Sequence, residues 1–287
     1  MSKVIVRRTN QGEIMDLMKS KIGIIGLGQM GSGISANLVK AGYNITGFDL
    51  KADAIKRLTD IGGYASDSAE EIVVNCDVVL VCVEGRDAIK IFDNIILPNA
   101  RNGQIFIDHS TVPAPEIRRI GQALVDKGCQ YLDAPISGGS EGASKGTLRI
   151  FVGGDKDTFD KCLELFKVIG NPEKIVYCGK IGMGQIGKVV QQLTTRFPNL
   201  ARLEVMVFGL RAGLDLETVM RALDVEPNSS DPYAWDYYLQ EVRASGFYMP
   251  MLGAMFEFCK DAEKSTFDAL RRPEPSIWNE LMKRHRN

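Results

Sequence analysis

The fold of this chain is decided by the stretch Ile22-Gly23-Ile24-Ile25-Gly26-Leu27-Gly28-Gln29-Met30-Gly31. An apolar strand pattern leads into a glycine turn, and a helical pattern follows. Gly26 allows a tight turn, Gly28 lets the backbone approach a pyrophosphate, and Gly31 lets the helix pack closely on the strand. The start of such a helix offers unpaired N–H groups to phosphates, so the stretch is typical of a dinucleotide-binding site.

A strand predicted over Tyr43–Phe48 ends at an acidic residue, Asp49. Asp49 follows Gly31 by 18 residues, a spacing at which its carboxylate can accept hydrogen bonds from ribose hydroxyl groups. No Arg lies at this strand end to pair with a 2′-phosphate. The sequence therefore favours NAD, and it leaves NADP open because Lys51 is nearby.

A second glycine run, Gly182-Met183-Gly184-Gln185-Ile186-Gly187, has the same spacing in a different context. No strand-end acid follows it, because the residues around Glu204 have a helical pattern. With Lys188 the run also resembles a phosphate-binding loop, but Val189 stands where that loop needs Ser or Thr to hold magnesium. We therefore expect this run to have a purpose other than binding a dinucleotide.

The composition indicates a soluble globular protein that binds neither nucleic acid nor a membrane. Of the 287 residues, 45% are hydrophobic and 25% are charged, and the net charge is −1, so the chain lacks the basic excess that such partners require. No apolar run approaches the ~18 residues of a membrane span, and no signal peptide is visible. The six Cys show no C-x-x-C spacing, which favours reduced thiols in a cytoplasmic protein.

The order of elements predicts an α/β protein with a Rossmann-type doubly wound parallel sheet followed by an all-α C-terminal domain. We expect a leader over residues 1–20, a dinucleotide-binding domain over 21–181 and a helical substrate and dimerisation domain over 182–287. Further strands are predicted at Asp77–Val83, Gln104–Asp108, Gln130–Asp133, Leu148–Val152 and Lys174–Cys178. Helices are predicted at Ala52–Leu58, Ser68–Val74 and Ala114–Asp126.

The ends of three predicted strands, at Val83, Asp108 and Asp133, should meet at the edge of the sheet where such folds bind ligands. Strand-like runs cease after Gly179, and a long helical pattern covers Gln185–Arg211. Pro198 should kink or break this helix, because proline lacks the backbone N–H. Shorter helices are predicted at Leu216–Leu223, Tyr233–Arg243, Met249–Leu270 and Ser276–Arg284. Their apolar residues should form a core or the interface of a homodimer or homotetramer.

Interconversion of an alcohol and a carbonyl with a nicotinamide cofactor needs a group that moves the hydroxyl proton. The chain has two His, too few for a His-rich metal site; His285 lies near the chain end, and His109 follows a strand end. Lys188 is the better candidate, because it follows a glycine turn and opens a helix. Gln191 and Gln192 share its face at i+3 and i+4. A solvated surface lysine is the alternative.

The segment Asp133–Ala143 combines Pro, Ser and several Gly after a predicted strand. The Ser137 hydroxyl and the exposed N–H groups of this segment could hold a substrate carboxylate as a small anion nest. An ordinary flexible loop is an equally open interpretation of the composition.

Five motifs resemble, in order, those of the β-hydroxyacid dehydrogenase family, which includes 3-hydroxyisobutyrate dehydrogenase and tartronate semialdehyde reductase and is related to 6-phosphogluconate dehydrogenase. The motifs are Gly26–Gly31, Asp108–Pro113, Asp133–Ala143 with Gly146-Thr147-Leu148, Gly182–Lys188 and Lys260-Asp261. The resemblance covers residues 21–262. It also implies that the second glycine run is the entrance to an interdomain helix.

The resemblance implies a role for each matching residue. Lys188 resembles the family's catalytic lysine, which is the general acid in reduction and the general base in oxidation. The residues implied to contact a small carboxylate substrate are Ser137, Gly138, Gly139, Gln191 and Gln192. The residues implied to contact the cofactor are Gly26, Leu27, Gly28, Gln29, Met30, Gly31, Asp49, Cys82, Val83, Thr111 and Lys260. No metal is implied.

The chain departs from the family's pattern at several places. Gln191 stands where the family commonly has Asn, and its longer side chain could reshape the pocket. Val83 replaces the usual Pro, and Pro198 is unexpected in the interdomain helix. The chain also ends about a helix early.

The leading hypothesis is an NAD-dependent oxidoreductase that interconverts a small β-hydroxy acid and its semialdehyde or keto form by hydride transfer. An imine reductase on the same scaffold is an alternative, although those relatives usually replace the lysine. A non-catalytic NAD(P)-binding protein is another alternative, suggested by the paired Gln, Pro198 and the early end. The particular hydroxy acid is not readable, and Trp235, Tyr237 and Tyr238 are only suggestive of its pocket.

Overall fold

A computed structural model of the chain describes residues 17–223 and residue 250. The chain divides into two compact units, Met1–Gln191 and Gln192–Asn287, and the domain boundary predicted at residue 181 stays a prediction. Most of the predicted leader lies outside the described residues. Lys260 also lies outside the described residues, as do Trp235, Tyr237 and Tyr238. The predicted helices beyond residue 223 lie outside them as well, except for residue 250.

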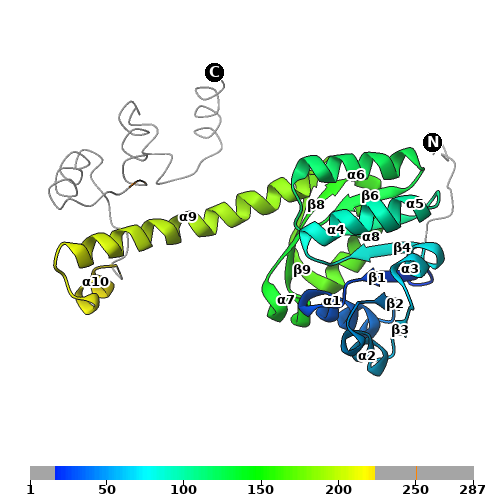
Figure 1. The fold of residues 1–287 in the computed structure, drawn as a ribbon, viewed down its shortest axis with the longest axis horizontal. Coiled ribbons are helices and arrows are strands. Elements are labelled where there is room, and N and C mark those ends of the chain that lie inside the picture. Colours follow the sequence, from blue (N-terminus) through cyan, green and yellow to red (C-terminus); the bar gives the residue numbers. More distant parts are fainter. Residues whose placement is uncertain (1–16, 224–249, 251–287) are drawn as a thin grey trace, which may run out of the picture. The chain divides into compact units, whose positions relative to one another are not determined.

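The first unit is built on a nine-stranded sheet in the order β3-β2-β1-β4-β5-β6-β8-β7, with β9 paired to β8 (Figure 1). The strands are β1 Lys21–Ile25, β2 Asn44–Phe48, β3 Tyr64–Ala65, β4 Val78–Val81, β5 Ile105–Asp108, β6 Gln130–Asp133, β7 Ile136–Ser137, β8 Leu148–Gly154 and β9 Gly170–Gly179. The strand order reverses between β1 and β4, which gives the predicted doubly wound topology and places a ligand-binding edge at that point.

The strands from β3 to β6 are all parallel. Val81 pairs with Asp108, and Asp108 pairs with Asp133, so three strand ends meet at one edge as predicted. By contrast, β8 runs antiparallel to β6 and β7, so the sheet is mixed where the sequence predicted parallel strands alone. The chain leaves β6 through β7 and one short helix without a long crossover, and β8 therefore runs back in the opposite direction.

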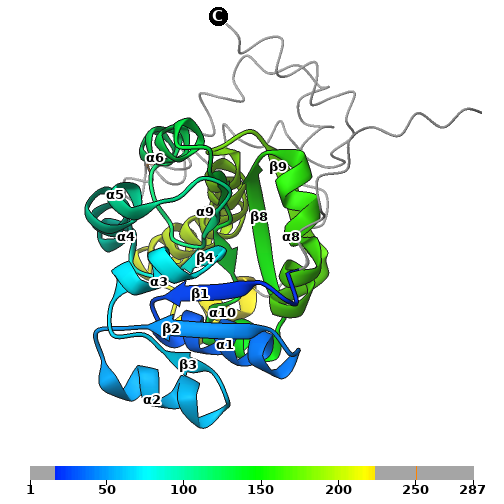
Figure 2. The ribbon, with the colours of Figure 1, turned by 90° about the vertical axis from the view of Figure 1, so that its right-hand side faces the viewer.

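Helices cover both faces of this sheet (Figures 1 and 2). One face packs against α1 Gln29–Lys40, α2 Ala52–Asp60, α7 Gly139–Lys145 and α8 Lys156–Ile169. The other face packs against α3 Ala69–Asn75, α4 Gly85–Ile91, the π-helical turn η1 Phe92–Ile96 and α6 Ala114–Asp126, and α5 Leu97–Asn99 continues η1. Successive strand residues alternate between the two cores: Ile105 and Ile107 of β5 enter the first, and Phe106 enters the second.

The helix α9 spans Met183–Arg211 and contains Pro198 as an internal residue. Of the two predicted effects of Pro198, the break is wrong, because the helix is one element of 29 residues, and the kink stays a prediction. Proline removes one backbone hydrogen bond, and the bonds of the turns on both sides maintain the helix. The helix α10, Leu216–Leu223, has the predicted bounds. None of the helices between residues 17 and 223 is long and apolar enough to cross a membrane.

Candidate active site

The turn between β1 and α1 has the backbone that the first glycine run predicts. Gly26 has a φ of +96°, a value that residues with a Cβ rarely adopt. A Cβ on Gly31 would overlap the Gly26 carbonyl, so α1 packs directly on the turn. Gly28 is the N-cap of α1, and the space where its Cβ would lie is open. Because no side chain caps α1, its first N–H groups are available to a phosphate.

Asp49 follows β2 and is tied to the same turn. Its Oδ2 accepts a hydrogen bond from the Leu27 N–H at 2.7 Å, and its Oδ1 accepts one from the Lys51 N–H at 2.9 Å. These two bonds fix the orientation of a carboxylate that is only partly buried. Each oxygen retains a lone pair that can accept a further hydrogen bond, as the predicted ribose contact requires.

A cavity of about 380 Å³ brings together residues from segments far apart in the sequence. Its lining is Met30, Val83, His109, Ser110, Thr111, Ile136, Ser137, Gly138, Gly139 and Lys188. Seven of these ten residues are among the predicted site residues, and His109 is the residue that the sequence offers as an alternative base. The cavity therefore joins the predicted nicotinamide end, the predicted carboxylate loop and the predicted proton-transfer lysine.

Lys188 lies near the start of α9, and only 6% of its surface is exposed. Its ammonium donates a hydrogen bond to the Ile136 carbonyl. The alternative of a solvated surface lysine is therefore wrong. Burying an ammonium group is costly, so a buried lysine that lines a cavity is a strong candidate for a functional residue.

The second glycine run provides close packing at the start of α9. Gly182 has a φ of +89°. A Cβ on Gly184 would lie 2.6 Å from the Phe151 carbonyl oxygen and 2.8 Å from Asp133 Oδ2, and one on Gly187 would lie 2.8 Å from the Cys178 sulfur. The first turn of α9 can therefore lie directly on β8 and on the end of β6. The sequence predicts only that this run has a purpose other than binding a dinucleotide, and that stays a prediction.

His109 is buried beside the cavity and is neutral at physiological pH. Burial lowers its pKa to about 4. A carbonyl can only accept, so the 2.8 Å bond between His109 Nδ1 and the Ala134 oxygen assigns the proton to Nδ1. His109 Nε2 is buried and has no hydrogen-bond partner among residues 17–223, so it is available to a bound molecule. The buried Ser110 hydroxyl interacts with the Asp108 carboxyl and can still accept a further hydrogen bond. The sequence indicated neither feature.

Two buried carboxyl groups lie at the strand ends beside the cavity. Burial raises the pKa of Asp108 to about 7, although the Ser110 N–H and the Tyr131 hydroxyl donate to this carboxyl. Burial also raises the pKa of Asp133 to about 6, although N–H groups at the start of α9 donate to it. These groups can therefore change charge close to neutral pH.

Several implied site residues do not line the cavity. Leu27 and Cys82 belong to the surroundings of the glycine turn, and Gln29 is exposed at the start of α1. Burial raises the pKa of the Cys82 thiol to about 12, so it is a thiol and not a thiolate. Gln191 and Gln192 lie at the division between the two units, and their substrate contacts stay predictions.

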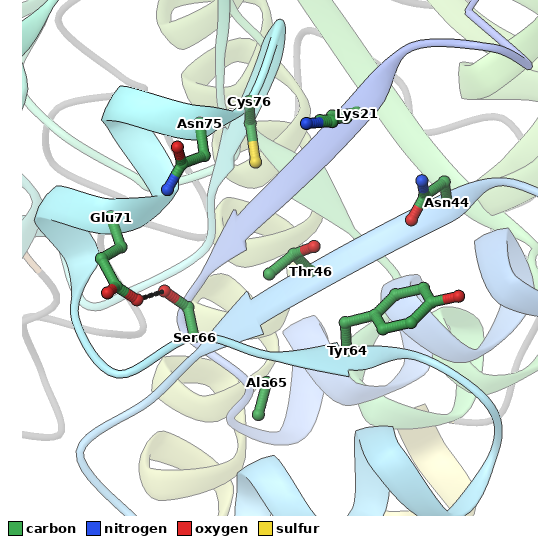
Figure 3. Close-up of a pocket in the computed structure, with 9 residues that line it drawn as sticks. All are labelled: Lys21, Asn44, Thr46, Tyr64, Ala65, Ser66, Glu71, Asn75 and Cys76. Atoms are coloured by element: carbon green, nitrogen blue, oxygen red, sulfur yellow. Dashed lines mark hydrogen bonds between the residues drawn. The ribbon is translucent and has the colours of Figure 1, made fainter.

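A second cavity, of about 340 Å³, is formed over β1, β2 and β3 (Figure 3). Its lining is Lys21, Asn44, Thr46, Tyr64, Ala65, Ser66, Glu71, Asn75 and Cys76. The Ser66 hydroxyl donates to the Glu71 carboxylate at 2.9 Å, so these two side chains satisfy each other (Figure 3). None of the predicted site residues lines this cavity, which is therefore distinct from the candidate site.

Residues 21–190 match the family model of the NAD binding domain of 6-phosphogluconate dehydrogenase. The chain belongs to this family. It therefore carries an NAD-binding domain, and the predicted resemblance to the β-hydroxyacid dehydrogenases is confirmed by the relatives that follow.

Curated relatives of similar sequence include several dehydrogenases. The mitochondrial 3-hydroxyisobutyrate dehydrogenase of Mus musculus is 30% identical over 221 residues, which are 75% of this chain and 65% of the mouse protein. The NAD-dependent L-serine dehydrogenase of Pseudomonas aeruginosa is 33% identical over 202 residues, which are 69% of this chain and 67% of the bacterial protein. The chain thus spans about two thirds of the length of these relatives.

Solved structures of this fold include both dehydrogenases and imine reductases. The 3-hydroxyisobutyrate dehydrogenase of Mycobacterium tuberculosis with L-serine has a TM-score of 0.65 and 26% identity, and the match covers 84% of this chain and 92% of that chain. An imine reductase variant from Myxococcus stipitatus in complex with NAD+ has a TM-score of 0.70 and 16% identity, covering 85% and 93%. The second likeness concerns the fold alone.

The residues of this chain fit an NAD molecule. The uncapped start of α1 and the open space at Gly28 suit a pyrophosphate. The carboxylate of Asp49 suits a ribose. The unpaired Nε2 of His109 and the hydroxyl of Ser110, both beside Met30, suit a planar group that carries an amide, since each can accept a hydrogen bond.

Proposed function

We propose that this chain is an NAD-dependent oxidoreductase that interconverts a small β-hydroxy acid and its semialdehyde or keto form. The observation that carries the proposal is the burial of Lys188 in the same cavity as Met30, Thr111 and the Ser137–Gly139 loop. Hydroxy acids of the size of 3-hydroxyisobutyrate and L-serine, which are in the names of two relatives, suit a cavity of about 380 Å³.

Lys188 would handle the proton of the substrate hydroxyl. In reduction its ammonium would donate a proton to the oxygen of the carbonyl, and in oxidation the neutral amine would accept that proton. The Ile136 carbonyl accepts from the ammonium and so directs it within the cavity. His109 suits this role poorly, because with a pKa of about 4 roughly one molecule in a thousand would be protonated at neutral pH.

The Ser137–Gly139 segment would bind the carboxylate of the substrate. Gly138 has a φ of +141° and Gly139 a φ of +64°, so the backbone turns sharply between β7 and α7. This turn leaves N–H groups at the start of α7 without a side-chain cap, and such groups bind anions well. The Ser137 hydroxyl can donate one further hydrogen bond.

The start of α1 and Asp49 would hold the pyrophosphate and one ribose of NAD. Ser110, Thr111 and His109 would orient the nicotinamide end. A bound nicotinamide supplies or accepts the hydride. The Asp49 carboxylate would favour NAD over NADP, because it accepts ribose hydroxyls and repels a 2′-phosphate.

The replacement of Lys188 by Met tests the proposal. With 3-hydroxyisobutyrate or L-serine and NAD+, the wild-type chain should form NADH, measured by absorbance. Lys188→Met should lower kcat by at least about a hundredfold, because general acid–base catalysis contributes this much, while the Kd for NADH, measured by fluorescence, should change little. Lys174→Met, which changes an exposed lysine of β9, is the matched control and should retain full activity.

The outcome also separates the alternative functions. Undiminished turnover by Lys188→Met would contradict the role of the lysine. Reduction of cyclic imines by NADH, with no oxidation of any hydroxy acid, would favour an imine reductase. Binding of NADH with no turnover of either substrate class would favour a non-catalytic NAD-binding protein.

A further inference from the structure

The first turn of α9 is anchored by a carboxylate from another element. Asp133 is the last residue of β6 and is fully buried. Its Oδ1 accepts a hydrogen bond from the Gly182 N–H at 2.7 Å, and its Oδ2 accepts one from the Gln185 N–H at 3.0 Å. Both carboxylate oxygens are therefore used to hold the backbone that opens the helix.

Glycines make room for this anchor. A Cβ on Gly153 of β8 would lie 2.7 Å from the Gly184 nitrogen and 2.8 Å from the Lys180 carbonyl oxygen, and one on Gly184 would lie 2.8 Å from Asp133 Oδ2. Real Cβ atoms do not come this close to backbone or carboxylate atoms. The start of α9 therefore lies closer to β8 and to the Asp133 carboxylate than a side chain at Gly153 or Gly184 would allow.

Gln185 provides a second attachment on the same turn. Its side-chain Nε2 donates to the Ser110 carbonyl at 2.9 Å, and its Oε1 accepts from the Val112 N–H at 3.3 Å. These bonds join α9 to the loop after β5, which carries Thr111. Only 3% of the surface of Gln185 is exposed, so water does not compete for these groups.

Lys188 follows Gln185 by three residues and therefore projects from the same side of the helix. Its ammonium donates to the Ile136 carbonyl. Three elements thus contact the first two turns of α9. They are the end of β6, the strand β7 and the loop that follows β5. Three such contacts fix the rotation of a helix about its axis and its position along that axis.

We propose that Asp133 and Gln185 are positioning residues that hold the start of α9 so that the amine of Lys188 stays inside the cavity. The inference rests on the proposed function for the catalytic consequence, although the position of the lysine can be tested without turnover. Neither residue needs to touch the substrate or the cofactor. The effect of Asp133 reaches the reaction through the placement of Lys188, whereas Gln185 also holds the loop that carries Thr111.

Asp133→Asn removes one acceptor and keeps the size of the side chain. The amide nitrogen of Asn cannot accept, so the N–H of either Gly182 or Gln185 would be left buried without a partner. Asp155→Asn is the control for the loss of a carboxylate charge at the start of a helix, because only Oδ2 of Asp155 accepts from the Thr158 N–H, at 3.0 Å in α8, and the Asn oxygen can replace that acceptor. A general effect of the lost charge would appear in both variants, whereas a lost acceptor would appear in Asp133→Asn alone.

Limited acetylation of lysines measures the position of Lys188 directly. The full-length chain is treated with a limiting amount of acetic anhydride, and peptide mass spectrometry gives the rate at Lys188 relative to the exposed Lys56. We expect slow labelling of Lys188 in the wild type and in Asp155→Asn. The relative rate should rise about fivefold in Asp133→Asn, since one lost hydrogen bond is worth ~1 kcal/mol. An unchanged rate in Asp133→Asn would overturn the proposal.

Gln185→Met gives a second test that does not depend on the folding of Asp133→Asn. Met has a similar length and forms neither side-chain bond, so the labelling rate of Lys188 should rise while thermal unfolding remains cooperative. If the labelling rate in Gln185→Met equals that of the wild type, Gln185 does not position the lysine. Labelling that rises at all lysines together would indicate general unfolding and would also contradict the proposal.

Kinetic measurements separate this inference from the proposed function. With 3-hydroxyisobutyrate or L-serine, Asp133→Asn should lower kcat with little change in the Kd for NADH, and Asp155→Asn should leave kcat unchanged. In a chain that also carries Lys188→Met, Asp133→Asn should cause no further loss. Full turnover by Lys188→Met would contradict the proposed function and leave the labelling result intact, whereas equal kcat values in Asp133→Asn and Asp155→Asn would contradict the positioning role.

Discussion

Asp108 illustrates how burial couples the ionisation of one side chain to the stability of the fold. Burial is the main cause that raises its pKa from 3.8 to about 7, the charge of Asp133 adds to the rise, and the Ser110 N–H and the Tyr131 hydroxyl oppose it. A carboxyl with a raised pKa binds its proton more tightly in the folded state than in the unfolded state. Its contribution to stability is therefore complete below the unfolded pKa and is lost as the pH rises through about 7.

We predict that Asp108→Asn makes the free energy of unfolding less dependent on pH. Asn cannot ionise, and its amide can still bond to the Ser110 N–H and the Tyr131 hydroxyl. Between about pH 4 and about pH 7 the wild type should lose up to roughly 1.4 kcal/mol per pH unit from this group, and the variant should not. Urea unfolding across this range measures the difference, with Asp93→Asn, a change of an exposed carboxylate, as control. Parallel pH profiles for wild type and Asp108→Asn would contradict the prediction.

Individual residues were predictable where a motif fixes the side-chain type. Gly26 and Gly31 are required by backbone geometry, so the sequence identified both correctly. The partners of Asp133 and Lys188 were not predictable, because they are backbone N–H and carbonyl groups, which every residue possesses. The unpaired Nε2 of His109 likewise depends on burial, which the spacing of residues in the sequence does not reveal.

At the scale of elements, the helix that opens at the cofactor turn is joined to the helix that follows the predicted carboxylate loop. Asn37 of α1 donates from Nδ2 to the Ala143 carbonyl of α7 at 2.7 Å and to the Ser144 carbonyl at 3.3 Å. A Cβ on Gly33 would lie 2.6 Å from the carbonyl carbon of Ala143, so the two helices are in backbone contact. The position of α7 therefore depends on α1.

We predict that Asn37→Ala loosens α7 with little effect on the rest of the fold. The loss of these bonds should cost about 1 kcal/mol of unfolding free energy. Amide hydrogen exchange in residues 139–147 should accelerate more than exchange in β5, because local opening of α7 becomes easier. Asn99→Ala, which removes a bond from Asn99 Nδ2 to the Ile95 carbonyl, is the control and should leave exchange in residues 139–147 unchanged. Equal exchange in both variants would show that Asn37 does not hold α7.

Elements with a strong pattern were predicted with accurate bounds, and weakly patterned ones were missed. The helix α6 and the strand β6 have the predicted bounds. The stretch α4–η1–α5 was not predicted, because a π-helical turn shifts the helical period within it. The helix α7 is not predicted by the sequence, since its Gly-rich composition favours no element. The antiparallel direction of β8 depends on a connection whose path the sequence does not encode locally.

At the scale of the whole molecule, the residues that build the first unit form two self-contained cores. One core lies between the sheet and the layer of α1, α2, α7 and α8, and the other lies between the sheet and the layer of α3, α4 and α6. The residues of both cores lie between Leu17 and Ile181. Every predicted cofactor contact except Lys260 also belongs to the first unit.

We therefore predict that a fragment of residues 1–191 folds and binds NADH without residues 192–287. Its unfolding in urea should be cooperative, because both cores are complete within it. Its Kd for NADH should lie within about tenfold of that of the full chain, a difference of ~1.4 kcal/mol, if Lys260 adds only one contact. The same fragment with Gly31→Ala is the control, since a Cβ at that position would overlap the Gly26 carbonyl and should abolish binding. A fragment that folds but binds NADH hundreds of times more weakly would show that the second unit supplies an essential part of the cofactor site.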